Sequence, residues 1–415
     1  MRRLLTYLAA LLTLGLLAAG WYAYDKGFTR KWRTYVAREF RKRGVELWMS
    51  RLTLDPLRGI IAKNVQVFDG KDKRRTVAVI DEMRLMINWA NFVRGRPFVD
   101  ALDLTDASLS LPIDPREPRG QKFEVSGLSG KLRLPPQQIY LSRLETNLYG
   151  MRVTASGRLI NPEKFSQTDL GQAIDREQWL RLAGKVAALL QAIRFSGPPP
   201  EVHLRFSGDL AQPQLLFAEL NVRASQVHYR DIKLRSLNAA AVFRDGRVEV
   251  KQFAATDGRG TLHVSAEYDV AEQSLTAQLR SSINPMPLVR SLTPLKLELE
   301  FEDPPMLELT ARANFRQSPQ VKLVAHVNTG IFTYRAVRFD YALADFSTDG
   351  RRWSLRDALL ATATGQVEGD IVCTTDEVRS QLTSSIPPSV LRPLFDGPAE
   401  PWLARVAFVE AAPTP

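Results

Sequence analysis

The chain has 415 residues, of which 45% are hydrophobic and 24% are charged, and its formal net charge is +11. This length exceeds that of one ordinary domain, and the hydrophobic content excludes a disordered chain. The single cysteine, Cys373, excludes an internal disulfide bond and is expected as a small buried side chain in a strand. Because the sequence has no P-loop, dinucleotide-binding glycine motif or Gly-x-Ser-x-Gly, we expect neither an enzyme nor a cofactor. No nucleic-acid-binding motif accompanies the basic charge, so no nucleic-acid partner is expected.

The first predicted element is an apolar segment without charged residues from Leu4 to Tyr24. Its 21 residues would span about 30 Å as a helix, which is the thickness of a bilayer core. The run is longer than the apolar core of a signal peptide, and Leu17 occupies the minus-three position of the best cleavage site, after Ala19. We therefore predict an uncleaved transmembrane anchor; the alternative is export followed by cleavage.

A short basic helix is predicted at residues 28–43, because aromatic and aliphatic residues recur there at helical spacing with basic residues around the other side. The helix would lie on the bilayer surface, or it would pack its apolar stripe on the first strands; the pattern does not separate the two. The candidates for membrane-surface contact are Phe28, Trp32, Tyr35, Arg30, Lys31 and Arg33.

From residue 45 onward, apolar and polar residues alternate with a period of two, which is typical of strands with one apolar face. The clearest example is Leu295–Glu302, and Asp-Gly pairs such as 245–246 mark the turns. The predicted fold is mainly β: a long curved antiparallel sheet of the repeating β-groove, or taco-like, type, with an N-terminal transmembrane helix and one helical insertion. The candidates for lining the apolar groove are Leu204, Phe206, Val248, Val250, Leu275, Leu279, Leu295, Leu297, Leu299 and Phe301.

The predicted helical insertion covers residues 175–195, with a stripe that comprises Trp179, Leu182, Val186, Leu189 and Ile193. It would cap an end or an edge of the sheet, or dock a partner. The predicted organisation is an anchor (1–24), a basic juxtamembrane helix (25–44), a first β region (45–162), the insertion with a Pro-rich linker (163–200), a first β repeat (201–290) and a second β repeat with the C-terminal tail (291–410).

An internal repeat relates the last two regions. Tyr229-Arg230 matches Tyr334-Arg335, Asp245-Gly246 matches Asp349-Gly350, Gly260 matches Gly365, and Ser281-Ser282-Ile283 matches Ser384-Ser385-Ile386, about 104 residues apart. Repeated strand units that stack along one axis predict a quasi-one-dimensional body. The apolar faces of such units either line an open groove or bury one another in a closed sandwich, and periodicity does not distinguish these arrangements.

The order of these features resembles that of the AsmA family of bacterial envelope proteins. The residues that carry the resemblance are an N-terminal apolar segment, a basic helix, the strand–corner–strand stretch 52–69, the strand 98–109 and Gly-Arg-Leu-Ile-Asn-Pro at 157–162. The resemblance implies an inner-membrane anchor, a periplasmic β body and a role in phospholipid transport or outer-membrane biogenesis. It implies no catalytic residues.

We expect membrane phospholipids as partners, and an envelope protein as a second partner. The placement of the body in the periplasm follows the resemblance and opposes the positive-inside rule, because eight Lys/Arg residues lie just after the apolar segment. One alternative function is a structural envelope-assembly protein with a closed β core that carries no lipid; a remote alternative is an anchored hydrolase.

Overall fold

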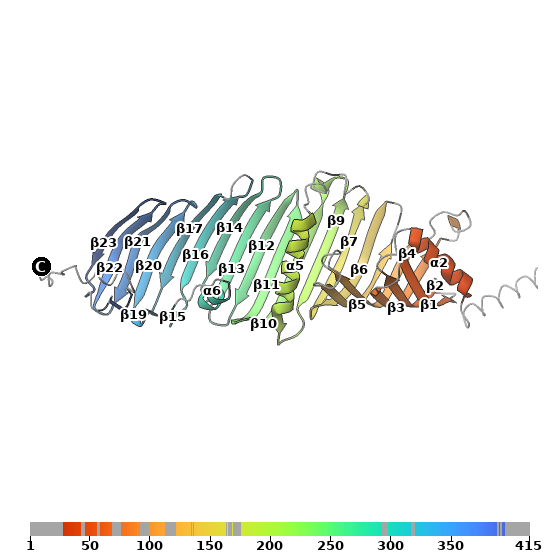
Figure 1. Cartoon of the computed structure of the whole chain (residues 1–415), viewed down its shortest axis with the longest axis horizontal. Helices are drawn as coiled ribbons and strands as arrows, with labels where there is room; N and C mark the ends of the chain where they lie inside the picture. The colour runs from red at the N-terminus through yellow and green to blue at the C-terminus, as the bar shows by residue number, and fades with distance from the viewer. Residues whose placement is uncertain are drawn as a thin grey trace, which may run out of the picture. The chain divides into compact units, whose positions relative to one another are not determined.

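The computed structural model describes residues 28–42, 46–55, 59–68, 76–88, 90–91, 94, 99–112, 122–133, 135, 137–162, 164, 168, 176–292, 298–316, 320–387, 390 and 392–394. The mainly β prediction is confirmed (Figure 1). An open, mixed sheet contains 20 strands, and three short strands form a second sheet.

The chain divides into two compact units. Unit 1 comprises residues 1–192 and 199–220, and unit 2 comprises residues 193–198 and 221–415. The division falls inside the strand Phe217–Tyr229, so the strand at Glu201–Asp209, which was expected to open the first β repeat, belongs to unit 1.

Unit 1 contains two long helices and eight strands among its described residues. They are α2 (Arg30–Lys42), β1 (Glu46–Asp55), β2 (Gly59–Phe68), β3 (Thr76–Ile87), β4 (Val99–Pro112), β5 (Lys122–Arg133), β6 (Gln138–Leu148), β7 (Met151–Ile160), α5 (Arg176–Ala192) and β9 (Glu201–Asp209), with a 3-10 turn at Pro213–Leu215. Strands β1 to β7 pair antiparallel in chain order.

The expectation of a wholly antiparallel sheet is wrong at one place, because β7 and β9 pair in parallel from Arg152–Glu201 to Ile160–Asp209. A parallel pair needs a long crossover connection, and the segment that contains α5 supplies it. The predicted helical insertion is therefore the crossover of this strand pair. The backbones approach closely here, since a Cβ atom on Gly157 would overlap the carbonyl oxygen of Phe206.

The described part of the predicted stripe of α5 does not face inward. Val186 and Leu189 are exposed, whereas Ala187 is fully buried. Ile193, expected to extend the stripe, lies instead in the short strand β8 (Ile193–Phe195), opposite Tyr229. Because Ala187 is small, the helix backbone can lie close to its neighbouring segment at this point. The helical periodicity of large apolar residues does not predict such a contact.

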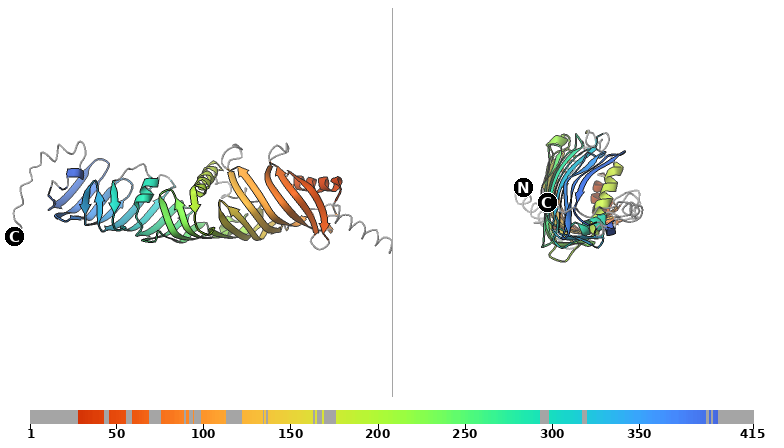
Figure 2. Two further views of the ribbon diagram at one scale, coloured as in Figure 1. Left: turned by 90° about the horizontal axis from the view of Figure 1, so that it is seen from below. Right: turned by 90° about the vertical axis from the view of Figure 1, so that its left-hand side faces the viewer.

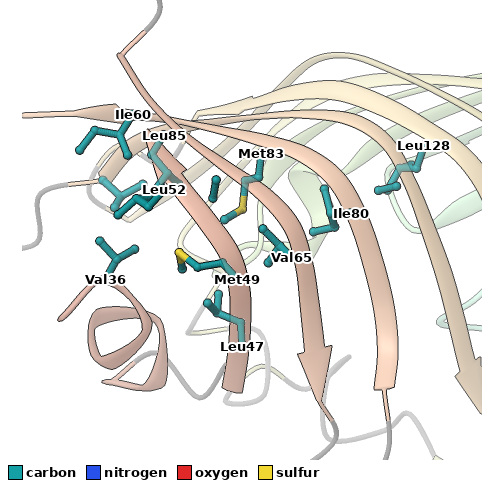
Figure 3. Close-up of a cluster of buried hydrophobic side chains, with 13 residues drawn as sticks. Val36, Leu47, Met49, Leu52, Ile60, Val65, Ile80, Met83, Leu85 and Leu128 are labelled. Carbon is teal, nitrogen blue, oxygen red and sulfur yellow. The ribbon is translucent and has the colours of Figure 1, made fainter. Parts of the chain in front are cut away.

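The core of unit 1 lies between α2 and the apolar face of β1 to β5 (Figure 3). Val36 of α2 is 4% exposed and extends toward the strand side chains, and Phe28, Ala37 and Phe40 pack around the same cluster. The strand residues with the least exposure in this cluster include Leu52, Ala62, Val65, Leu85 and Ala107. Of the two arrangements expected for the basic helix, packing on the first strands is the one observed.

Unit 2 contains a continuous antiparallel series of longer strands and a small second sheet. The elements are β8, most of β10 (Phe217–Tyr229), β11 (Ile232–Arg244), β12 (Arg247–Thr256), β13 (Thr261–Asp269), β14 (Ser274–Ser281), α6 (Met286–Leu292), β15 (Leu299–Phe301), β16 (Met306–Asn314), β17 (Gln320–Thr329), β18 (Phe332–Tyr334), β19 (Val337–Phe339), β20 (Tyr341–Thr348), β21 (Trp353–Thr362), β22 (Gly365–Cys373) and β23 (Val378–Ser384), with a 3-10 turn at Arg392–Leu394. The strands of unit 2 bend along their length (Figure 2).

The turns of the sequence repeat have matching structures. Arg230 lies over the ring of Tyr229 at 5.4 Å, and Arg335 lies over the ring of Tyr334 at 5.6 Å. Both arginines have a positive φ, 50° and 48°, so each tight turn adopts the left-handed conformation at the same position.

Gly260 and Gly365 occupy matching positions of the repeat, and neither position has room for a side chain. A Cβ atom on Gly260 would lie 2.0 Å from the carbonyl oxygen of Ser282, and one on Gly365 would lie 2.6 Å from that of Ser385. The serine hydroxyls accept hydrogen bonds from the amides of Thr261 and Gln366, at 3.0 and 2.9 Å. The sequence repeat is therefore also a structural repeat.

Among the described residues, none of the helices has both the length and the apolarity that crossing a bilayer requires. The predicted anchor at residues 4–24 lies outside the described residues.

We predict that Leu85→Ala lowers the free energy of unfolding of unit 1 by about 2–5 kcal/mol, because Leu85 is fully buried and the change leaves a cavity. Val79 lies on the opposite face of the same strand and is 42% exposed, so Val79→Ala should change stability by less than about 0.5 kcal/mol. Denaturant unfolding of both variants measures the difference. Equal effects would contradict the assigned faces of β3.

Candidate functional site

The register of unit 2 aligns apolar side chains in a row that crosses nine strands, from β11 to β22. In order of pairing, the row is Ala239, Phe253, Val264, Leu279, Leu309, Ala325, Phe346, Leu355 and Ile371. Each residue is the registered partner of the next, so the row is continuous across the sheet.

A parallel row runs beside the first on the same face. It contains Phe243, Val248, Tyr268, Leu275 and Ala313, and a row between the two contains Ala241, Val250, Ala266, Ala277, Ala311 and Leu323. None of these side chains carries a charge, because successive residues of a strand alternate between faces and the charged residues occupy the other face.

Most of this apolar face is half-buried rather than buried. In the first row only Ala325 is classed as buried, and Leu279 and Leu309 stay partly exposed. The second sheet of unit 2 contributes a compact cluster of Phe332, Val337 and Phe339 that contacts the apolar face at Ala342 and Leu360. In the described part of unit 2, this small sheet is the one sheet separate from the main one, so a closed sandwich is not formed.

The apolar face of unit 1 differs in its degree of burial. At β1 to β4, α2 covers it and the central side chains are almost inaccessible. The burial decreases toward β9, where Leu204 and Phe206 pair with Ala155 and Gly157 and remain half-buried.

The opposite face of unit 2 is a charged surface. The register places His263, Arg280, Glu308, His326 and Asp345 in one row. Arg280 forms an ion pair with Glu308 at 3.2 Å, and Nδ1 of His326 lies 2.5 Å from Oδ1 of Asp345. Cross-strand pairs of opposite charge stabilise the register and keep this face hydrated.

The edge of this face carries a carboxylate with a shifted pKa. The amide of Glu272 donates a 2.9 Å hydrogen bond to Asp269 and lowers the pKa of that carboxyl, and the guanidinium of Arg247, at 3.0 Å, lowers it further. Asp349 lies in the turn between β20 and β21, where the backbone amides of Arg352 and Arg351 lower the pKa of its carboxyl. Both shifts come from turn hydrogen bonds, so they indicate structural turns rather than acid–base chemistry.

The structure places six of the predicted groove residues on the apolar faces. Leu204 and Phe206 lie on β9 of unit 1; Val248, Val250, Leu275 and Leu279 lie on β12 and β14 of unit 2. Leu299 and Phe301 lie in β15 of the small sheet, against the Phe332 cluster, and not among the rows. Leu295 and Leu297 lie outside the described residues.

The residues predicted to contact the membrane surface fall into two groups, one packed against the core and one exposed. Phe28 packs against the core of unit 1, whereas Trp32 and Tyr35 are 45% and 41% exposed and form an edge-on ring contact with centroids 6.2 Å apart. Arg30 and Lys31 are exposed, and Arg33 is half-buried with Nη1 donating to the carbonyl oxygen of Ser50.

Several residues of the apolar rows were not identified from the sequence. They include Phe253, Val264, Leu309, Phe346, Leu355 and Ile371. β-Bulges in β12 at Val250–Phe253 and in β21 at Leu355–Ala358 shift the period of two by one residue, so simple alternation assigns Phe253 and Leu355 to the wrong face.

Other chemistry-bearing residues are dispersed. No cluster of His, Cys, Asp and Glu side chains that could hold a metal ion exists among the described residues. Cys373 is half-buried opposite Trp353, on the apolar face of β22, where its Sγ lies 3.4 Å from the carbonyl oxygen of Thr374.

Comparison with protein-family models, curated proteins and solved structures found no match to this chain.

We predict that the apolar face of unit 2 is accessible to water-soluble thiol reagents. In a Cys373→Ala background stripped of lipid, Leu279→Cys and Leu309→Cys should react with a charged maleimide in the folded state. Leu85→Cys, fully buried in unit 1, should react more than about a hundredfold more slowly, because its exposure requires unfolding. Gln278→Cys, on the opposite face of β14, gives the rate of an exposed thiol. Equal protection of Leu309→Cys and Leu85→Cys would show that the apolar face is covered.

Proposed function

We propose that this chain binds the acyl chains of phospholipids on the apolar face of unit 2. The observation that carries the proposal is the continuous, uncharged and half-exposed row from Ala239 to Ile371, which follows the registered pairing of nine strands. A row of this kind offers an apolar path without interruption by a charge.

The size of the face supports a lipid rather than a small ligand. Eight spacings between nine strands correspond to about 38 Å, roughly two and a half times the ~15 Å of the acyl chains in one bilayer leaflet. Soluble monomers seldom leave an apolar patch of more than a few hundred Å² uncovered. An occupant with flexible hydrocarbon chains would cover these rows and would adapt to their alternation of alanine with larger side chains.

The absence of Asp, Glu, Lys and Arg side chains from the rows favours hydrocarbon chains specifically. A charged side chain among acyl chains would lose its hydration without gaining a partner, which is costly. The ion pairs Arg280–Glu308 and Arg247–Glu267 lie on the opposite face, where they contact water. The two faces thus separate a hydrocarbon path from a hydrated exterior.

The cellular role that we propose follows from the resemblance to the AsmA family. The chain would be held in the bacterial inner membrane by residues 4–24, with a β-groove body in the periplasm that assists phospholipid transport and outer-membrane biogenesis. The resemblance, the apolar segment and the acyl-compatible face support this role together. An envelope protein remains the proposed second partner.

Substitution of a central row residue tests acyl binding. Leu279→Glu should reduce the phospholipid that co-purifies with the full chain by about tenfold or more, because the carboxylate would have to be dehydrated among acyl chains. Gln278→Glu introduces the same charge on the neighbouring residue of β14, on the opposite face, and should leave the bound phospholipid unchanged. Mass spectrometry quantifies the lipid, and thermal unfolding monitors the fold.

The outcomes of this test are distinct. A folded Leu279→Glu chain that has lost its lipid supports the proposal. A folded chain with its full complement of lipid contradicts it, and so does a wild-type chain that contains no phospholipid and binds none from vesicles of phosphatidylethanolamine and phosphatidylglycerol. That last result would favour a structural role in envelope assembly.

We predict that a reporter fused after Pro415 is active only if the reporter requires export. The periplasmic placement opposes the count of positive charges after residue 24, so the result discriminates between the two orientations. Paired fusions to an export-dependent phosphatase and to a cytoplasm-dependent fluorescent protein measure the topology. Fluorescence with an inactive phosphatase would contradict the periplasmic placement.

A further inference from the structure

A second surface feature lies far in sequence from the apolar rows, at the start of unit 1. Helix α2 carries arginines at positions 30, 33, 38 and 41. With 3.6 residues per turn, these spacings return to one side of the helix, within an arc of roughly 140°. The sequence therefore gathers four guanidinium groups along a helix of 13 residues.

The packing of α2 turns this arginine side toward β1. Val36, Ala37 and Phe40 contact the core of unit 1 and fix the rotation of the helix. Between α2 and β1 lies a hollow of about 250 Å³. It is lined by Arg30, Arg33, Thr34, Ala37, Arg38, Arg41, Leu47, Trp48 and Met49. At about 30 Å³ for each water molecule, the hollow has room for a group several times larger than water.

Two of the arginines are held in place by the protein. Arg41 forms a bidentate ion pair with Glu46, with Nε–Oε2 and Nη2–Oε1 distances of 2.6 Å, and this carboxylate, 7% exposed, raises the pKa of Arg41. Arg33 donates from Nη1 to the carbonyl oxygen of Ser50, and its Nε is buried without a hydrogen-bond partner. Two of the guanidinium groups that line the hollow are therefore held by the protein, and that of Arg33 has a donor without a hydrogen-bond partner.

The described lining of the hollow has an excess of positive charge. Among the ion pairs that the described residues form, the one that involves these arginines joins Arg41 to Glu46. Arg30 and Arg38 are exposed at the rim. Among the described residues, the hollow is thus lined by four arginines and by no acidic side chain, and mutual repulsion of the guanidinium groups favours a bound anion.

We propose that this hollow binds a phosphate group. A guanidinium group can donate two parallel hydrogen bonds to the oxygen atoms of a phosphate. Several guanidinium groups around one cavity therefore recognise the shape of a phosphate, which a single ammonium group would not do. Trp48, 46% exposed on β1, adds an indole N–H donor and a flat apolar wall. The phosphate comes from a phospholipid headgroup or from free phosphate, and these sources share the recognition chemistry. The proposal does not rest on acyl binding in unit 2.

Neighbouring residues of α2 offer a matched test. Arg30 lines the hollow and Lys31 does not, yet both are exposed and each carries one positive charge. In the full chain, calorimetric titration with inorganic phosphate and, separately, with a water-soluble short-chain phosphatidylglycerol should give weaker binding for Arg30→Gln and Arg38→Gln, by about tenfold or more in the double variant. Lys31→Gln should bind as the wild-type chain does.

The two titrations distinguish the sources. If the lipid binds in an arginine-dependent manner and inorganic phosphate binds at least tenfold more weakly, the hollow is a headgroup site. If the two ligands bind with equal affinity, it is a site for free phosphate. The proposal is overturned if Arg30→Gln and Lys31→Gln weaken binding equally, which would indicate net charge alone, or if the wild-type chain binds neither ligand. Leu279→Glu should not affect binding of inorganic phosphate, so a failure of acyl binding leaves this test intact.

Discussion

Registered backbone hydrogen bonding between neighbouring strands holds each unit together and sets which side chains share a face. Each ladder places an apolar residue opposite an apolar residue, for example Val264 opposite Leu279 and Leu279 opposite Leu309. Because a slip of one residue would reverse the faces of a whole strand, the register is strongly specified wherever one face avoids water. The apolar rows, the charged ladder on the other face and the bulges that preserve both are consequences of this pairing.

The same alternation has different outcomes in the two units. In unit 1, α2 places Val36 over the strands, and side chains such as Leu85 become inaccessible to water. In unit 2, the rows from β11 to β22 stay half-buried, and the small sheet around Phe339 contacts the main sheet at Ala342 and Leu360. One region therefore gains stability by burying its apolar face, while the other retains apolar surface that an occupant could cover.

The repeat shows how turn chemistry preserves a strand unit. The Tyr-Arg turns at 229–230 and 334–335 share a left-handed arginine and its contact with the preceding ring. At Gly260 and Gly365 the carbonyl oxygen of a serine approaches too closely for any side chain. These positions lie where the chain turns from one strand to the next, so backbone geometry constrains them. The residues between them can differ as long as apolar and polar residues keep alternating.

The mainly β class, the basic helix and the repeat followed from the sequence alone, because alternation and turn residues act locally. The sequence also predicted Leu204, Phe206, Val248, Val250, Leu275 and Leu279 on apolar faces, as observed. Three features became evident from the folded chain: β7 and β9 pair in parallel, Leu299 and Phe301 pack in a separate sheet, and the arginines of α2 line a hollow against β1. These features depend on contacts between residues distant in the chain, and on bulges that change the phase of a strand, neither of which a local period records.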